Sequence, residues 1–206
     1  TTITNTFYVP EDKVDVTIKK VWEDNNNEAG KRPDSITLQI KDEDTVIDEY
    51  VVTSADSWKH TFTVPKYDEN ADEITYTADE LELNKFYQKT ISGTTVTNTF
   101  GVPTETIDIT STKVWNDNND KAGKRPESVT LQIKNGNSIV EEIKITAEDN
   151  WTATFTELPK YNNLGNEISY TVDDKETPKF YKKEISGTTV TNTFYVREDT
   201  RRVTAT

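Results

Sequence analysis

Ser-Gly-Thr-Thr-Val-Thr-Asn-Thr-Phe occupies residues 92–100, and the same nine residues return unchanged at 186–194. A close copy, Thr-Thr-Ile-Thr-Asn-Thr-Phe, lies at residues 1–7. The three asparagines are Asn5, Asn98 and Asn192, so successive copies are 93 and 94 residues apart. A repeat of this length is too long for a solenoid unit and is typical of tandem, self-contained β-domains.

Other short motifs recur at the same spacing and define the module. Lys20-Val21-Trp22 returns as Lys113-Val114-Trp115, and Trp58 returns as Trp151. The second copy is one residue longer, and the extra residue lies between Phe155 and Pro159, where we expect a turn. We divide the chain into a last-strand remnant of a preceding repeat (1–9), a first domain (10–101), a second domain (102–195) and the start of a following repeat or a tail (196–206).

The residue types predict an all-β protein. Thr, Val, Ile, Tyr and Phe are plentiful, and helical periodicity is nearly absent. Turn-forming residues separate about seven short strands in the first module, the number expected of a β-sandwich. We predict these strands near residues 13–22, 35–41, 46–53, 57–64, 73–80, 85–92 and 94–100.

Composition excludes several classes of function. The chain has 24 basic and 37 acidic residues and a net charge of −13, whereas nucleic acids and anionic membranes bind basic surfaces. There is no cysteine, so disulfides and thiolate metal sites are excluded. No apolar run approaches the roughly 20 residues that span a bilayer. We therefore expect no nucleic-acid partner, no membrane insertion and no cofactor.

Strand alternation places three polar residues of each module on the buried face, because alternate side chains of a strand share a face. Lys20 shares its face with Ile18 and Trp22, Asn98 with Val96 and Phe100, and Glu80 with Tyr76 and Ala78. In the second module the equivalent residues are Lys113, Asn192 and Asp174. Each module is thus predicted to bury an amine, an amide and a carboxyl group.

Two interpretations of these residues are open. The first is a buried Lys20–Glu80 salt bridge with Asn98 as a hydrogen-bond partner, although such pairs rarely stabilise a fold more than an apolar core does. The second is a reaction: burial favours the neutral amine and the neutral acid, and a neutral lysine is a nucleophile. A protonated Glu80 bonded to the Asn98 carbonyl oxygen would then promote attack by Lys20, loss of ammonia and a Lys–Asn isopeptide bond.

Four motifs occur in order in both modules and cover nearly the whole chain: Lys-Val-Trp followed by Asp-Asn-Asn, Arg-Pro-(Asp/Glu)-Ser-(Ile/Val)-Thr-Leu, Tyr-Thr-x-(Asp/Glu)-(Glu/Asp) and Val-Thr-Asn-Thr-Phe. In these motifs the chain resembles the B-type repeat domains (CnaB) of Gram-positive collagen adhesins, which also occur as shaft domains of pili. The resemblance implies two tandem inverse immunoglobulin-like (prealbumin-like) β-sandwiches, each with a self-generated Lys–Asn cross-link between its first and last strands.

Carried over residue by residue, the resemblance makes Lys20 the nucleophile, Asn98 the acceptor and Glu80 the proton shuttle. Lys113 and Asn192 match in the second domain, but Asp174 stands where this domain type usually has Glu, and its shorter side chain is expected to reach the amide less well. Joining Lys20 to Asn98 closes a loop of about 79 residues. By analogy with disulfides, such a cross-link stabilises by roughly 4–5 kcal/mol.

The functional expectation is a stalk of cross-linked repeats that carries an adhesive head on a cell-wall-anchored surface protein. The alternative is that the repeats themselves bind a host or matrix ligand. The expected partners are neighbouring repeats of the same chain, with a host matrix protein bound through another region, and the expected state is a monomer. The chain is not expected to be a turnover enzyme, because the reactive groups are buried.

Two weaker signals favour structural explanations. Asp24, Asn26 and Glu28 are spaced somewhat like a calcium loop, but Gly30 is one position late for an EF-hand, so a plain loop is favoured. His60 shares a face with Trp58 and Phe62, and alanine replaces it in the second module. It is predicted to be a core or rim residue, and no metal site is expected.

Overall fold

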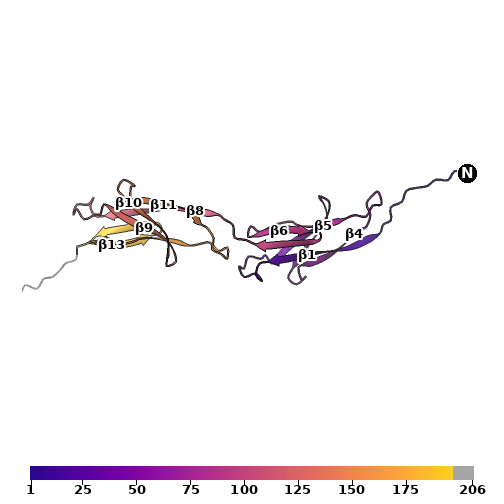
Figure 1. The fold of residues 1–206 in the computed structure, drawn as a ribbon, viewed down its shortest axis with the longest axis horizontal. Helices are drawn as coiled ribbons and strands as arrows, with labels where there is room; N and C mark the ends of the chain where they lie inside the picture. Colours follow the sequence, from indigo (N-terminus) through magenta and orange to yellow (C-terminus); the bar gives the residue numbers. More distant parts are fainter. Residues whose placement is uncertain (197–206) are drawn as a thin grey trace, which may run out of the picture. The chain divides into compact units, whose positions relative to one another are not determined.

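The structure is a computed structural model that describes residues 1–196, and strands are the only regular elements in that range. The chain divides into two compact units between Pro103 and Thr104. Among the described residues each unit contains seven strands, as predicted. Figure 1 labels several of them in each unit. Those of the first domain are β1 (Lys13–Glu23), β2 (Ser35–Asp42), β3 (Thr45–Thr53), β4 (Lys59–Pro65), β5 (Tyr76–Glu80), β6 (Tyr87–Ser92) and β7 (Thr95–Phe100).

The second domain repeats this series. Its strands are β8 (Thr106–Asn116), β9 (Ser128–Asn135), β10 (Ser138–Thr146), β11 (Thr152–Pro159), β12 (Tyr170–Asp174), β13 (Tyr181–Ser186) and β14 (Thr189–Phe194). Within residues 1–196 there is no helix long and apolar enough to span a membrane. The expected start of a following repeat falls, apart from Val196, outside the described residues.

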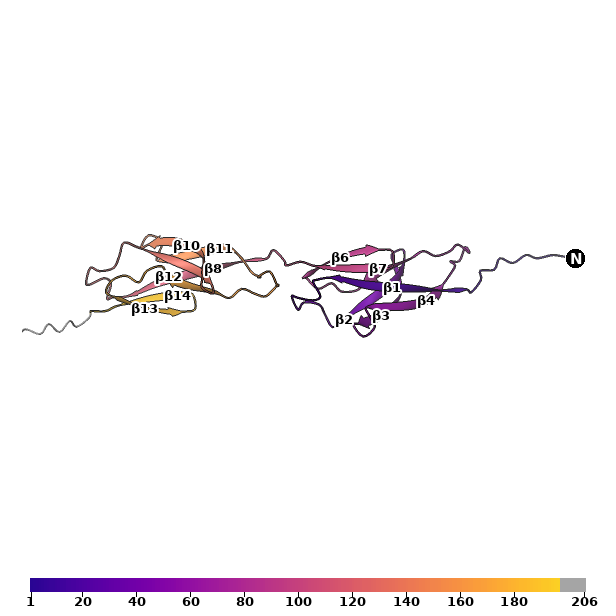
Figure 2. The same ribbon diagram turned by 60° about the horizontal axis from the view of Figure 1, so that its bottom comes forward.

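Each domain is a sandwich of a four-stranded and a three-stranded sheet. In the first domain the strand orders are β4-β1-β7-β6 and β3-β2-β5. β1 pairs with β4 in the antiparallel sense and with β7 in the parallel sense (Figure 2). The alternating apolar residues meet between the sheets, where Ile18, Leu38, Ile40 and Val96 are fully buried. The first and last strands of a domain are therefore neighbours in one sheet, which brings residues from its two ends together.

The extra residue of the second domain lies within a strand, so the expectation of a turn is wrong. Phe155 pairs with Ile109 and Leu158 with Ile107, which leaves two residues opposite one. Glu157 adopts a positive φ of 55°, and its backbone N–H donates a hydrogen bond to Asp108 at 2.9 Å. This β-bulge absorbs the insertion while Phe155 and Leu158 both stay buried.

The copy of the last strand at the start of the chain forms no strand. Residues 1–12 have no assigned secondary structure, and residues 1–8 are exposed, including Asn5. In both domains the equivalent segment lies between the first and sixth strands of its sheet. Residues 1–7 make no such pairing within the described part of the chain.

Candidate functional site

The predicted amine, amide and acid of each domain lie together in its core. Lys20 is on β1 and Asn98 on β7, and the parallel register pairs Trp22 with Asn98. Lys20 is thus two positions from the partner of Asn98 and on the same face, a separation of about 8 Å between Cα atoms that the two side chains span. Glu80 projects from β5 of the facing sheet. Lys20, Glu80 and Asn98 are 3%, 4% and 1% exposed.

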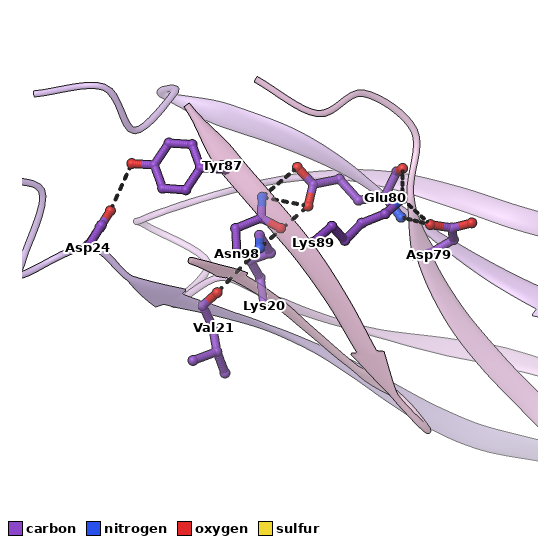
Figure 3. A network of polar contacts seen from close by, with 8 residues as sticks. All are labelled: Lys20, Val21, Asp24, Asp79, Glu80, Tyr87, Lys89 and Asn98. Atoms are coloured by element: carbon purple, nitrogen blue, oxygen red, sulfur yellow. Dashed lines mark hydrogen bonds and ion pairs between the residues drawn. The ribbon is translucent and has the colours of Figure 1, made fainter. Parts of the chain in front are cut away.

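In the first domain the carboxyl group of Glu80 contacts both other groups (Figure 3). Its Oε2 lies 3.4 Å from Lys20 Nζ. Asn98 Nδ2 donates to Oε1 at 3.1 Å and to Oε2 at 3.0 Å. Asn98 Oδ1 has no hydrogen-bond partner within the described residues. The acid therefore faces the amide nitrogen, whereas the sequence led us to expect it at the carbonyl oxygen.

The surroundings of Lys20 make its amine easier to deprotonate. Burial lowers the pKa of Lys20 from 10.5 to about 8, and the nearby Glu80 carboxylate opposes that shift only in part. The Lys20 amine also donates to the Val21 carbonyl oxygen at 3.3 Å and lies 4.3 Å from the centre of the Trp22 ring. A lysine with this pKa supplies a substantial neutral fraction at mildly alkaline pH.

The second domain has the same three positions but different contacts. Lys113 Nζ donates to Asp174 Oδ2 at 2.7 Å, and burial again lowers the pKa of the lysine. Asn192 is fully buried, yet neither its Nδ2 nor its Oδ1 has a hydrogen-bond partner among residues 1–196, and Asp174 Oδ1 has none either. The shorter aspartate thus reaches the amine and falls short of the amide.

A surface lysine that the sequence did not single out holds the acid strand in place. Lys89 on β6 donates to Asp79 Oδ1 at 2.5 Å and to the backbone oxygen of Glu80 at 3.0 Å. Lys183 contacts Asp173 and the backbone oxygen of Asp174 in the same way. Because each lysine bridges the end of the acid strand to the sixth strand, it fixes the height of the acid in the core. Its recurrence in both repeats was the feature of the sequence from which this role could have been predicted.

A second group that the sequence did not reveal closes the site at one end. Asp24 accepts hydrogen bonds from Arg32 Nε at 2.8 Å, Arg32 Nη2 at 2.5 Å and the Tyr87 hydroxyl at 3.0 Å. Tyr87 packs edge-on against Trp22 with ring centres 5.1 Å apart, and Arg32 Cζ lies 5.3 Å from the centre of the Trp22 ring. We call these four residues the cap. Its counterpart in the second domain is Trp115, Asp117, Arg125 and Tyr181.

The loop that begins at Asp24, which was considered above as a calcium site, supports the cap. Asn25, Asn26 and Asn27 have φ of 53°, 58° and 63°, a left-handed conformation that asparagine tolerates better than most residues. Asp24 Oδ1 accepts the Asn27 backbone N–H at 3.0 Å. The oxygens of Asp24 are thus occupied by protein donors. Within residues 1–196 no group of three or more His, Asp or Glu side chains is arranged to hold a metal ion.

The single histidine, predicted to be a core or a rim residue, lies at the rim. His60 is half-buried and stacks on Tyr50 with ring centres 3.7 Å apart and planes 8° apart. It also meets the edge of Phe62 at 4.6 Å. Tyr50 and His60 belong to β3 and β4, at the border between the two sheets of the domain.

Comparison with known proteins agrees with this architecture. The sequence profile of the Cna protein B-type domain matches residues 16–99 and 109–193. The collagen adhesin of Staphylococcus aureus is 34% identical over 208 aligned residues, which are 99% of this chain and 17% of that protein. The solved structure of two B repeat units (B1B2) of the S. aureus collagen binding protein is 31% identical, covers 89% of this chain and 50% of its own, and has a TM-score of 0.54.

Each of the two tandem seven-stranded sandwiches buries a lysine, an acid and an asparagine at its first, fifth and last strands, and this defines a class of repeated β-sandwich modules. The two profile matches together span most of the chain. The chain therefore belongs to the family of Cna protein B-type domains.

Proposed function

We propose that the two domains are stalk repeats of a Gram-positive, cell-wall-anchored surface adhesin and that each cross-links itself through a Lys–Asn isopeptide bond. The observation that carries the proposal is the first-domain site, where one carboxyl group contacts both a buried amine of lowered pKa and a buried amide. A buried, partly unpaired set of this kind costs several kcal/mol as a static feature. This energetic cost is explained if the three side chains are the precursor of a covalent bond.

The chemistry needs only the three side chains. The Lys20 ammonium passes a proton to Glu80, which leaves a neutral amine and a neutral acid. The amine attacks Asn98 Cγ, Glu80 gives its proton to Asn98 Nδ2, and the C–N bond of the amide breaks to release ammonia. The carboxylate takes the remaining proton from Nζ, so the product is a secondary amide and Glu80 ends protonated. Each group reacts once, and no turnover enzyme results.

The position of Glu80 suits the breaking of the amide. Amide nitrogen is a poor leaving group unless it is protonated, and general-acid assistance of this kind contributes about 10²–10⁴-fold to a rate. Both oxygens of Glu80 face Asn98 Nδ2, the atom that leaves. Lys20 and Asn98 are held by paired strands, so the fold supplies their proximity.

A surface location is proposed from the relatives. The matched curated protein is called a collagen adhesin, and the chain spans only 17% of its length, so its adhesive activity is not assigned to these repeats. A cross-link between the first and last strands suits a stalk, because a pull on the two ends of a domain passes through a covalent bond. It also stabilises a cysteine-free chain without an oxidant.

The intact mass of the native chain tests the proposal. We expect a mass lower than that of the encoded chain by two ammonia molecules, with the cross-linked peptides recovered after proteolysis as Lys20–Asn98 and Lys113–Asn192. The loss of one ammonia would restrict the chemistry to one domain, which the peptides identify. No loss would leave two buried salt bridges and contradict the proposal. Asn5, which is exposed and in no strand, is expected to keep its amide.

A second candidate function is binding of a matrix ligand by the first domain. It is favoured by the outer strand β3, where Val46, Ile47, Tyr50 and Val51 are 41–55% exposed. The stalk proposal expects no saturable binding of the native chain to immobilised collagen in surface plasmon resonance. Saturable binding that Val51→Lys weakens would favour the second function, since the second domain already has Lys144 at this position.

A further inference from the structure

The cap is built at a cost that packing alone does not explain. It places a carboxylate that is 1% exposed and a guanidinium group at the end of a small apolar core. Buried ion pairs of this kind seldom stabilise a domain more than apolar residues of the same volume. The two domains differ in their acid, Glu80 against Asp174, but have the same four residue types in the cap. The recurrence of these four residue types points to a role of the cap in the reaction.

The cap is joined to the reactive site through Trp22. The Lys20 amine lies 4.3 Å from the centre of the Trp22 ring. Tyr87 and Arg32 contact the same ring, and Asp24 binds both of them. Trp22 Nε1 is buried without a hydrogen-bond partner among the described residues. A ring with an unsatisfied N–H is free to turn toward water unless its neighbours hold it.

We propose that Asp24, Arg32 and Tyr87 are positioning residues for cross-linking, which hold the Trp22 ring over the Lys20 amine and keep water from it. The inference rests on the proposed function and assigns these residues no contact with the reacting atoms. The same role falls to Asp117, Arg125 and Tyr181, which surround Trp115, whose ring centre lies 5.0 Å from Lys113 Nζ.

The cap keeps its charge state over the pH range of the reaction. The hydrogen bonds from Arg32 lower the pKa of Asp24, and burial together with the bond to Asp24 raises the pKa of Tyr87. The charged groups that act on the Lys20 amine are Glu80 from β5, Lys89 from β6 and Asp24 of the cap, whose charge raises the pKa of Lys20. Because the cap does not titrate near neutral pH, a neutral change at Tyr87 that leaves Asp24 charged alters the lysine through water access and not through a change of charge.

The test measures the lysine directly. In an Asn98→Ala background Lys20 cannot be consumed, so NMR can follow its side-chain titration. Adding Tyr87→Phe keeps the ring but removes its bond to Asp24, and we expect the pKa of Lys20 to rise from about 8 toward 10.5. The rate of ammonia loss is measured in chain that keeps Asn98, has not yet reacted and is refolded from denaturant at pH 7. There Tyr87→Phe should slow ammonia loss about tenfold for each unit by which the pKa of Lys20 rises, because the neutral fraction of the amine falls by that factor. The rate should recover at higher pH.

Tyr76→Phe is the matched control. Tyr76 is also buried and its hydroxyl also donates one hydrogen bond, to the Pro65 carbonyl oxygen at 2.8 Å, but it belongs to β5 and not to the cap. It should lower stability without moving the Lys20 pKa. Arg32→Lys provides a second cap variant: it keeps the positive charge and the charge of Asp24 but cannot make both bonds from the guanidinium to Asp24, so it should act in the same direction as Tyr87→Phe. An unchanged Lys20 pKa in both cap variants overturns the inference, whereas the native intact mass decides the proposed function separately.

Discussion

Replacing Glu80 with alanine is expected to abolish ammonia loss from the first domain and to lower its free energy of unfolding by at least about 4 kcal/mol. Glu80 is the group that contacts both the amine and the amide. Without it the amide nitrogen has no proton donor, so the isopeptide bond does not form. The stabilisation that the closed loop would give to the folded domain is then lost. Lys20 is also left in the core without its carboxylate. Intact mass and denaturant unfolding measure the two effects.

Two further variants separate chemistry from packing. Glu80→Gln keeps the shape and the hydrogen bonding of the side chain but cannot transfer a proton, so the bond should fail while the sandwich still folds. Glu82→Ala removes an exposed acid two residues away and should change neither the number of ammonia molecules lost nor the stability. Full ammonia loss from the Glu80→Ala chain would remove Glu80 from the proposed role.

Alternation along the strands was enough to predict which polar residues are buried. A strand in a sandwich has one face toward the core, so a lysine, a glutamate and an asparagine that share a face with Ile18, Ala78 and Val96 had to be buried. The structure confirms this burial in both domains. The predicted strands also agree with the observed ones to within a few residues, because Asp, Asn, Gly and Pro mark the turns so clearly.

Contacts across the sandwich could not be predicted in the same way. Alternation says which face a residue occupies but not the height at which β5 crosses β7, and that height is set by packing between the sheets. For this reason the sequence did not show that Glu80 faces the amide nitrogen. The cap was missed for a related reason: Asp24, Arg32 and Tyr87 come from a loop and a distant strand, and only the folded chain brings them together.

The second domain is expected to form its bond more slowly than the first, and Asp174→Glu is expected to remove the difference. Asp174 Oδ2 accepts a hydrogen bond from Lys113 Nζ at 2.7 Å, but both polar atoms of Asn192 are without hydrogen-bond partners among residues 1–196. The carboxylate can therefore take the proton of the amine but is not placed to protonate the leaving nitrogen. Since general-acid assistance contributes about 10²–10⁴-fold, we expect the bond in the native second domain to lag by at least about 10².

The two rates are measured by refolding chain that has not reacted and by quenching and digesting samples at intervals. Both bonds then form in the same molecule, so each domain is the control for the other. Glu80→Asp is the reciprocal change and should slow the first domain to the rate of the second. The side chain of glutamate is one methylene longer, and Asn192 is fully buried, so Asp174→Glu brings a carboxyl group toward an amide that water does not reach. Equal rates in the native chain would mean that contact between the acid and the amine suffices and that the Glu80–Asn98 contact does not limit the reaction.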